Sequence, residues 1–497
     1  MQAASQATPV RAGPEKPGLP AVGGDASSAL RPLAGAGLVA LLGALAVLMI
    51  DAAAAPSHYV PADSGGWPGW LSGPLGGIGS HLGSATFQAL VLIVCGGYAL
   101  VLSGVRQLPP RALWAAIVLA HLLLFLGPPL ISQDVFGYSA FARMGALHGL
   151  DPYTHFPAEA SADPVFGFIG WPFQHSPYGP LFTLASYVTV PLGTAGGLWA
   201  LKALAGLSSL AAIALTAAAA KRLGRSPAFA AAFLGLNPVL LVLAVGGAHN
   251  DTALIMFLAL ALLLSAATAE RAARPRAAAL ALAGGVGVKL TAGLLLPFLI
   301  LGRPRWRERA GVLLAAVAGL GAVAVLGVAG FGVHALGFLT AIGEQQQLVA
   351  THSVPAETAR LLGLSGTPGW WRDLWVAGFL VALLFALWRV ARGADWRVAA
   401  GWTTLALLVS TAWLLPWYAV WPLPLAAVCG DRRLRGAVLA LCAYAILIHL
   451  PLAGPLLSPG GPPSGHLPHG VSLPGLGDRI EFTGLEVLRH VRLDLSW

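Results

Sequence analysis

Charged residues are scarce in this chain of 497 residues. Asp, Glu, Lys and Arg make up 10% of it, and hydrophobic residues make up 57%. Soluble domains carry about 25% charged residues, so the composition excludes an ordinary soluble enzyme. It predicts an all-α polytopic membrane protein. One span needs about 20 apolar residues, and the apolar runs allow about 11 to 13 transmembrane helices.

Cysteine and nucleotide-binding motifs are equally limited. The three cysteines, Cys95, Cys429 and Cys442, all fall inside apolar runs, so neither a disulfide framework nor a metal-ligand set is expected. The sequence has no Walker A loop, no Gly-x-Gly-x-x-Gly after a strand and no His-Glu-x-x-His. These absences exclude nucleotide-driven pumps, Rossmann cofactor enzymes and zinc proteases. No cofactor and no metal is predicted.

The basic residues that remain lie mainly in short loops between apolar runs. Arg11, Lys16 and Arg31 precede the first predicted span, 33–54, which places the N-terminus in the cytoplasm. The net charge of +9 is therefore interpreted as an orientation signal and not as a nucleic-acid surface. An odd number of crossings puts the C-terminus outside.

The expected domain organisation follows from these runs. The predicted parts are a disordered cytoplasmic tail 1–31, a transmembrane domain 32–453 with external loops 132–180 and 334–372, and an external Pro/Gly-rich tail 454–497.

The loop 132–180 carries an unusual density of polar residues. Unpaired charge in lipid costs roughly 2–4 kcal/mol per group, so this loop must lie at a surface or line a wet cavity. Asp134 closely follows the third apolar run, 113–131. Apolar residues at helical spacing over 135–147 predict an amphipathic helix along the outer interface, ended by Gly149.

Two apolar segments have unusual boundaries. Segment 180–192 is short and bounded by prolines, which predicts an outer-face helix or a partial insertion. Segment 277–301 has Lys289 near its middle, beside Gly287, and strongly basic residues on both flanks. A hairpin of two short helices keeps both flanks on one side, and broken helices at membrane depth occur around cavities or within protein. A full crossing of either segment stays open at this point.

With this topology the polar side chains gather on the external side. A wet acid–base cavity there is the layout expected of an enzyme that acts on lipid-carried substrates. Its members come from four separated parts of the chain: Asp134, His148, Tyr153, His175, Tyr178, His249, Asn250, Asp251, Glu344 and His352.

Several of these stretches occur together in a familiar order. QDVFGYSAFARMGALHGLDPYTHFP, SPYGPLF, GGAHND, GVKLTAGLLLPF and PWYAVWPLPL run from Gln133 to Leu425. The combination resembles the polyprenol-phosphomannose-dependent α-1,6-mannosyltransferases of lipomannan assembly, which are GT-C glycosyltransferases. The resemblance implies a GT-C bundle in the plasma membrane. It also implies inverting transfer of mannose from a polyprenyl-phosphate donor to a growing α-1,6-mannan acceptor on the outer face.

Besides a non-catalytic scaffold subunit, which would not need Asp134, two alternatives remain at this point. One is a transferase of another polyprenyl-phosphate sugar, such as an arabinofuranosyl donor. The other is a transporter or flippase of lipid-linked sugars, which would favour inverted repeats and sites at mid-membrane depth. No repeat is visible in the sequence.

The resemblance also assigns roles to residues. The family's catalytic carboxylate matches Asp134, and a carboxylate there can take the proton of an attacking sugar hydroxyl. Candidates to bind the donor phosphate are Lys289, His249, Lys202 and Arg143. Candidates to bind substrate are Tyr138, Tyr153, His175, Tyr178, Asn250 and Asp251.

Simpler interpretations compete with these roles. Asp134 is a preferred residue type for capping a helix N-terminus, and the triplet ending at Asp251 fits a turn plus a cap. Lys202 fits a snorkelling lysine. Asp151-Pro152-Tyr153 fits a turn that sets shape. Interface anchoring is the main expectation for five tryptophans: Trp371, Trp375, Trp413, Trp417 and Trp421.

Overall fold

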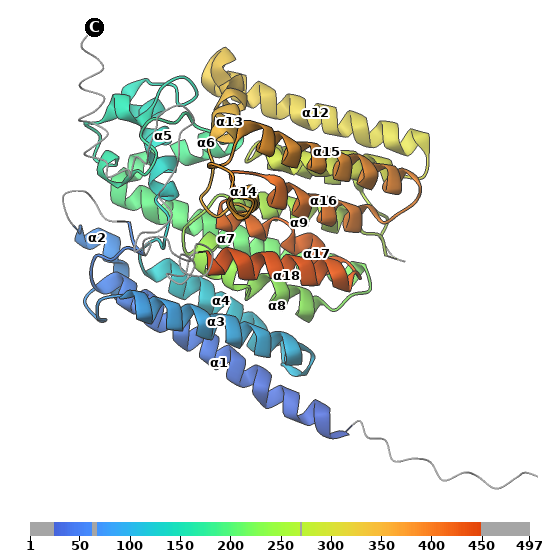
Figure 1. Ribbon diagram of the computed structural model, residues 1–497, viewed down its shortest axis with the longest axis horizontal. Coiled ribbons are helices and arrows are strands. Elements are labelled where there is room, and N and C mark those ends of the chain that lie inside the picture. Colours follow the sequence, from blue (N-terminus) through green and yellow to red (C-terminus); the bar gives the residue numbers. More distant parts are fainter. Residues whose placement is uncertain (1–23, 62–66, 269–270, 449–497) are drawn as a thin grey trace, which may run out of the picture.

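The computed structural model describes residues 24–61, 67–268 and 271–448, and the regular elements in these ranges are all helical (Figure 1). The predicted tail 454–497 lies outside the described residues, as do residues 1–23. Helix α1 (Gly24–Ala54) begins within the last residues of the predicted tail 1–31. The apolar run marks only the part that lipid or protein covers, whereas helical hydrogen bonding continues beyond it.

The first layer of the bundle consists of α1, α3 (Ser84–Gly104) and α4 (Pro110–Leu126), at the bottom of Figure 1. Helices α1 and α3 approach closely because glycines face each other. A Cβ atom on Gly37 would lie 2.7 Å from the carbonyl oxygen of Gly97. The predicted third span, 113–131, ends early at Leu126 because Gly127 and two prolines follow. Short elements flank α3: α2 (Gly69–Ser72), η1 (Gly73–Leu75) and η2 (Val105–Gln107).

The centre of the bundle is built from α7 (Gly193–Arg222), α8 (Pro227–Gly235), the π-helix η6 (Val239–Val245) and α9 (Asp251–Ser265). The predicted span 229–245 is broken, because α8 and η6 meet at an angle of 48°. Pro238 sits at this break, where its missing N–H removes a helical hydrogen bond.

The hairpin expected over 277–301 is present. Helix α10 (Pro275–Val286) runs toward Lys289, and η7 (Leu290–Leu295) and α11 (Leu296–Leu301) return. Helix α12 (Trp306–Phe331) then runs parallel to α10, as contacts near both ends show. Cβ atoms on Gly311 and Gly287 would lie 2.7 Å from Arg276 and 3.2 Å from Val323. The two basic flanks of the hairpin therefore lie at the same end of the bundle.

Helices α12 and α15 (Gly369–Ala391) are apolar, and only 17% and 11% of their most apolar windows are buried in the protein. Both lie along the upper edge of Figure 1, and their low burial is expected of lipid-facing helices. The predicted short span 418–429 consists instead of two buried pieces, η9 (Pro416–Val420) and α17 (Leu423–Val428). The remaining elements are η8 (Gly332–Leu336), α13 (Gly337–Gln347), α14 (Val354–Leu361), α16 (Trp396–Ser410) and α18 (Arg432–Leu447).

Within the described residues, five helices are long and apolar enough to cross a membrane, or six if α8 and η6 count as one span. The chain is a polytopic all-α membrane protein, as predicted. The expectation of 11 to 13 spans also counted apolar stretches that the structure breaks or shortens, such as α9 and η7–α11.

The loop 132–180 forms one end of the bundle, at the left of Figure 1. Its main helix, α5 (Asp134–His148), is followed by Gly149 at φ +65°, as predicted. From Asp134 to Met144 every residue of α5 except Gly137 is buried, so α5 is not the half-exposed helix that was expected. The end is completed by η3 (Pro157–Ala160), η4 (Phe166–Phe168), α6 (Pro180–Tyr187) and η5 (Val190–Leu192).

Candidate active site

Asp134 and His249 meet where α5 approaches α9. Asp134 is the first residue of α5 and 9% exposed, and its Oδ2 lies 3.3 Å from Nδ1 of His249. The residue in the capping position is Gln133, and no side-chain capping hydrogen bond is present. The capping interpretation of Asp134 is therefore wrong, because its carboxylate turns toward another part of the chain.

The imidazole of His249 is fixed on a second side. His249 is fully buried, and its ring stacks on Trp417 with centroids 3.9 Å apart and planes inclined by 18°. Trp417 belongs to η9, so the stack joins the start of α9 to a segment far away in sequence. The stack limits rotation of the ring and so keeps Nδ1 within 3.3 Å of Asp134, although neither ring nitrogen has a hydrogen-bond partner among the described residues.

A second charged pair lies two residues further along the chain. The Lys289 ammonium lies 2.9 Å from Oδ1 of Asp251, and the Trp421 indole donates to the same oxygen at 2.5 Å. Lys289 also lies 4.2 Å from the centre of the Tyr418 ring, a cation–π contact. Asp251 is fully buried and makes no cap, so that interpretation is also wrong.

Two strained residues precede these charged groups. Ile131 has φ +68° and Ala248 has φ +56°, a region in which residues other than glycine are uncommon. Their segments are joined, because the Leu130 N–H donates to the Gly246 carbonyl at 2.8 Å. Backbone strain of this kind clusters at functional sites, where the surrounding structure holds it in place.

Polar groups without partners lie beside the pair. The side-chain oxygen and nitrogen of Asn250 are buried and have no hydrogen-bond partner among the described residues. Tyr138 accepts a hydrogen bond from the Asn250 N–H at 3.4 Å and packs edge-on against Tyr178 at 4.9 Å. Burial raises the pKa of both phenols well above the usual value, so both stay neutral. This part of the site offers neutral donors and acceptors.

Four predicted site residues have partners elsewhere. Lys202 donates to the carbonyl of Gly127 and is buried, so it neither snorkels nor reaches Asp134. Arg143 pairs with Asp163 at 2.8 Å. The hydroxyl of Tyr153 donates to the Tyr178 carbonyl at 3.0 Å, which fits the shape-setting turn. His175 lies 3.0 Å from Glu344.

The site also contains residues that sequence reasoning assigned otherwise or missed. Trp413, Trp417 and Trp421 are 6–8% exposed, so they are buried and not interface anchors. Asp163, which holds Arg143 and His148, was not singled out. Burial acts to raise the Asp163 pKa, but hydrogen bonds from Arg143 and His148 hold that pKa below its usual value.

Basic groups gather at the other end of the bundle. Helix α7 starts beside α5, where a Cβ on Gly197 would lie 3.9 Å from Ser139, and it ends at Lys221 and Arg222. Burial lowers the pKa of the Arg435 guanidinium at that end, and the charge of the nearby Arg225 lowers it further. The acid–base site and the basic end therefore lie at opposite ends of α7.

A buried carboxylate paired with a histidine at one end of a polytopic bundle indicates a membrane-embedded enzyme that acts on a polar group. Comparison with known proteins gives the class. The family model described as alpha-(1->6)-mannopyranosyltransferase, N-terminal domain, matches residues 40–303. The chain belongs to this family, and it is a glycosyltransferase.

Individual relatives cover a similar range. Alpha-(1->6)-mannopyranosyltransferase A of Mycobacterium tuberculosis is 31% identical over 364 residues, which is 66% of this chain and 67% of the relative. A probable alpha-(1->6)-mannopyranosyltransferase of Mycolicibacterium smegmatis is 29% identical over 413 residues, 72% of each chain. No solved structure matches the chain.

Proposed function

We propose that the chain transfers mannose from a polyprenyl-phosphate donor to an α-1,6-mannan acceptor in one inverting displacement, with Asp134 as general base. The observation that carries this proposal is the contact of Asp134 Oδ2 with His249 Nδ1 at 3.3 Å in a buried site. A single displacement needs one base and not two paired carboxylates. Family membership supports mannose as the transferred sugar.

The chemistry assigns one role to each member of the pair. The Asp134 carboxylate takes the proton of the acceptor hydroxyl while that oxygen bonds to the anomeric carbon. The bond from this carbon to the phosphate oxygen breaks, and its electron pair leaves with the phosphate. Such a base contributes about 10²–10⁴ in rate. His249, stacked on Trp417, orients the carboxylate. This geometry favours a positioning role for His249 over phosphate binding.

The donor phosphate is assigned to Lys289. Its side chain is 14% exposed, and Asp251 uses only part of its three-donor capacity. Lys289 is preferred over Lys202, which is only 3% exposed, and over Arg143, which is engaged by Asp163. An ammonium next to a developing phosphate charge stabilises the leaving group.

A groove beside this pair supports a lipid-linked donor. It lies between α9, η7 and α16. Trp421, which bonds to Asp251, lines it, and the other lining residues are apolar except for two threonines: Leu254, Ile255, Leu258, Thr291, Ala292, Leu294, Leu295, Thr404 and Leu407. An apolar groove next to an ammonium group matches a prenyl chain attached to a phosphate.

The proposed membrane orientation follows from charge. Cytoplasmic loops are rich in Lys and Arg. The end of the bundle that holds Arg222, Arg225 and Arg435 is therefore assigned to the cytoplasm. The opposite end, with Asp134 and His249, is assigned to the outer face of the plasma membrane.

The decisive experiment is an assay of the purified full chain in lipid nanodiscs. The reaction contains polyprenyl-phosphate mannose and an α-1,6-linked oligomannoside. The expected product is longer by one mannose, with inverted anomeric configuration relative to the donor by NMR. If transfer occurs only from polyprenyl-phosphate arabinofuranose, the transferred sugar is arabinofuranose and not mannose. Movement of the donor across the bilayer without any product would contradict the transferase and indicate a flippase.

A further inference from the structure

Two tryptophans lie beside the residue that precedes Asp134. The rings of Trp171 and Trp413 pack edge-to-face, with centroids 5.6 Å apart and planes inclined by 76°. The neighbouring Gly170 lies against the side chain of Gln133, since a Cβ atom there would be 2.7 Å from Gln133 Oε1. The aromatic pair is thus close to the start of α5.

Trp413 has an unused hydrogen-bond donor. The side chain is 6% exposed, and its indole Nε1 is buried without a partner among the described residues. A buried donor with no acceptor is costly, so such groups are rare in folded proteins. A ligand oxygen, such as a sugar hydroxyl, would satisfy this N–H.

The segment before α14 packs against the backbone next to Trp413. The Ala350 N–H donates to the Ala412 carbonyl at 2.8 Å, and a turn from Ala350 to Ser353 follows. The Tyr444 hydroxyl donates to the His352 carbonyl at 2.7 Å. These two hydrogen bonds fix the backbone of His352 between α16 and α18.

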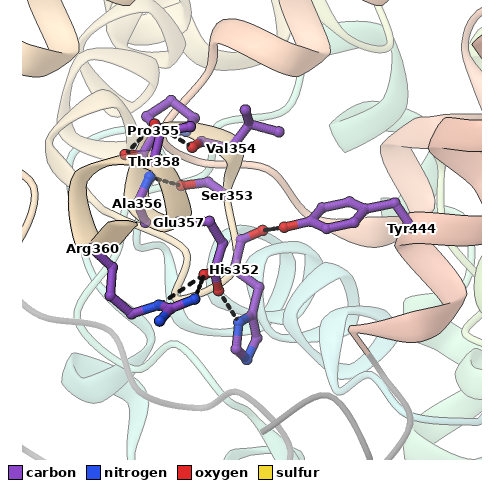
Figure 2. Close-up of polar contacts among 9 residues, drawn as sticks. All are labelled: His352, Ser353, Val354, Pro355, Ala356, Glu357, Thr358, Arg360 and Tyr444. Atoms are coloured by element: carbon purple, nitrogen blue, oxygen red, sulfur yellow. Dashed lines mark hydrogen bonds and ion pairs between the residues drawn. The ribbon is translucent and has the colours of Figure 1, made fainter. Parts of the chain in front are cut away.

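The imidazole of His352 is held by a short chain of charged groups, which Figure 2 shows. Its Nδ1 lies 2.6 Å from Glu357, and Arg360 binds the other Glu357 oxygen with two hydrogen bonds, at 2.8 and 2.9 Å. In Figure 2 Nδ1 of the ring faces Glu357, and Nε2 lies on the far side of the ring. Glu357 occupies Nδ1, so Nε2 is the ring nitrogen that remains for a ligand.

Together these groups have the composition of a carbohydrate site. Aromatic rings cover the apolar C–H faces of a pyranose, and fixed polar groups bind its hydroxyls. From these observations we infer that Trp171, Trp413 and His352 form the subsite for the acceptor saccharide, separate from Lys289 and its groove. This inference rests on the proposed transfer to a saccharide acceptor.

Three substitutions in the full chain test the subsite. Trp413→Phe keeps an aromatic ring but removes the Nε1–H donor. Trp171→Leu removes the aromatic ring on which the sugar would pack. His352→Phe removes Nε2. Each should raise the acceptor KM roughly 10-fold, the scale of one lost polar or stacking contact, with little change in donor KM. Trp370→Phe is the matched control, since Trp370 is 58% exposed at the start of α15. It should leave both constants unchanged.

Direct binding separates this inference from the proposed function. Titration of the detergent-purified chain with α-1,6-oligomannoside, followed by tryptophan fluorescence, should show binding that the three variants weaken and Trp370→Phe retains. Equal affinity in wild type and all three variants would overturn the subsite even if mannose transfer is observed. If wild type binds oligomannoside through these residues but transfers no mannose, only the proposed function fails. Size-exclusion profiles matching wild type establish that the variants are folded.

Discussion

The Lys289 ammonium lies 2.9 Å from Asp251 Oδ1 and joins the tip of the α10–η7 hairpin to the start of α9. Asp251 is fully buried, and its other carboxylate oxygen has no partner among the described residues. A buried carboxylate without its cation is strongly destabilising. The lysine therefore has a structural partner in addition to any ligand.

Lys289→Met should for this reason destabilise the protein by roughly 3–5 kcal/mol, the usual cost of breaking a buried ion pair. The double variant Lys289→Met with Asp251→Asn should recover most of this loss, because no buried charge remains. Thermal unfolding in detergent measures both. The double variant should still fail to bind polyprenyl-phosphate mannose, and normal donor affinity in it would remove Lys289 from the phosphate site.

Asp134→Asn should lower turnover by about 10²-fold or more, because it removes the proton acceptor and keeps the shape. Donor KM and the unfolding temperature should change little. Asp431→Asn is the matched control, since Asp431 caps α18 at the basic end and Asn caps equally well. Near-normal turnover of Asp134→Asn in the nanodisc assay would mean that another group is the base.

His249→Asn distinguishes two roles for the histidine. If His249 orients Asp134, its loss should lower kcat roughly 10- to 100-fold. Donor KM should stay near wild type, because orientation of the base affects the chemical step and not donor binding. Trp417→Leu, which removes the stacking partner, should reduce kcat in the same direction. A raised donor KM with unchanged kcat would instead support phosphate binding by His249.

The ionised Asp163 carboxylate should contribute to the free energy of unfolding in a way that depends on pH in the acid range. Its folded-state pKa is depressed, so the stabilisation is complete above the unfolded pKa, near 3.8, and is lost as the pH falls through the lower folded value. Asp163→Asn should therefore be less stable than wild type at pH 7, with the difference shrinking below about pH 4. Unfolding temperatures measured from pH 3 to pH 7 test this. A difference that does not change with pH would exclude the linkage.

Local signals in the sequence were sufficient for some features. Basic residues on both sides of Lys289 predicted the hairpin, and Gly149 predicted the end of α5. The polar triplet ending at Asp251 was placed on the same side as Asp134, and the structure brings the two parts together. These predictions depend on charge placement and glycine conformation, which act over a few residues.

Other features depend on tertiary packing. Tryptophan is a residue type that often anchors helices at the membrane interface. Only the folded chain shows that Trp417 contacts His249 and that Trp421 contacts Asp251. The choice of Asp163 as partner of Arg143 likewise requires a loop that folds back over α5. The bend at Pro238 was not predicted, because apolar composition does not show where a helix is broken.

The hairpin between Pro275 and Leu301 enters the bundle and returns, so it adds no net crossing to the chain. Because the hairpin passes through the bundle twice, the chain leaves it on the side where it entered, and this fixes the side of every later loop. Reporter enzymes fused just before Pro275 and just after Gly302 should register the same side of the membrane. Counting the apolar run as a single span would reverse the assigned side of the remaining chain, including the α14 segment that carries Glu357.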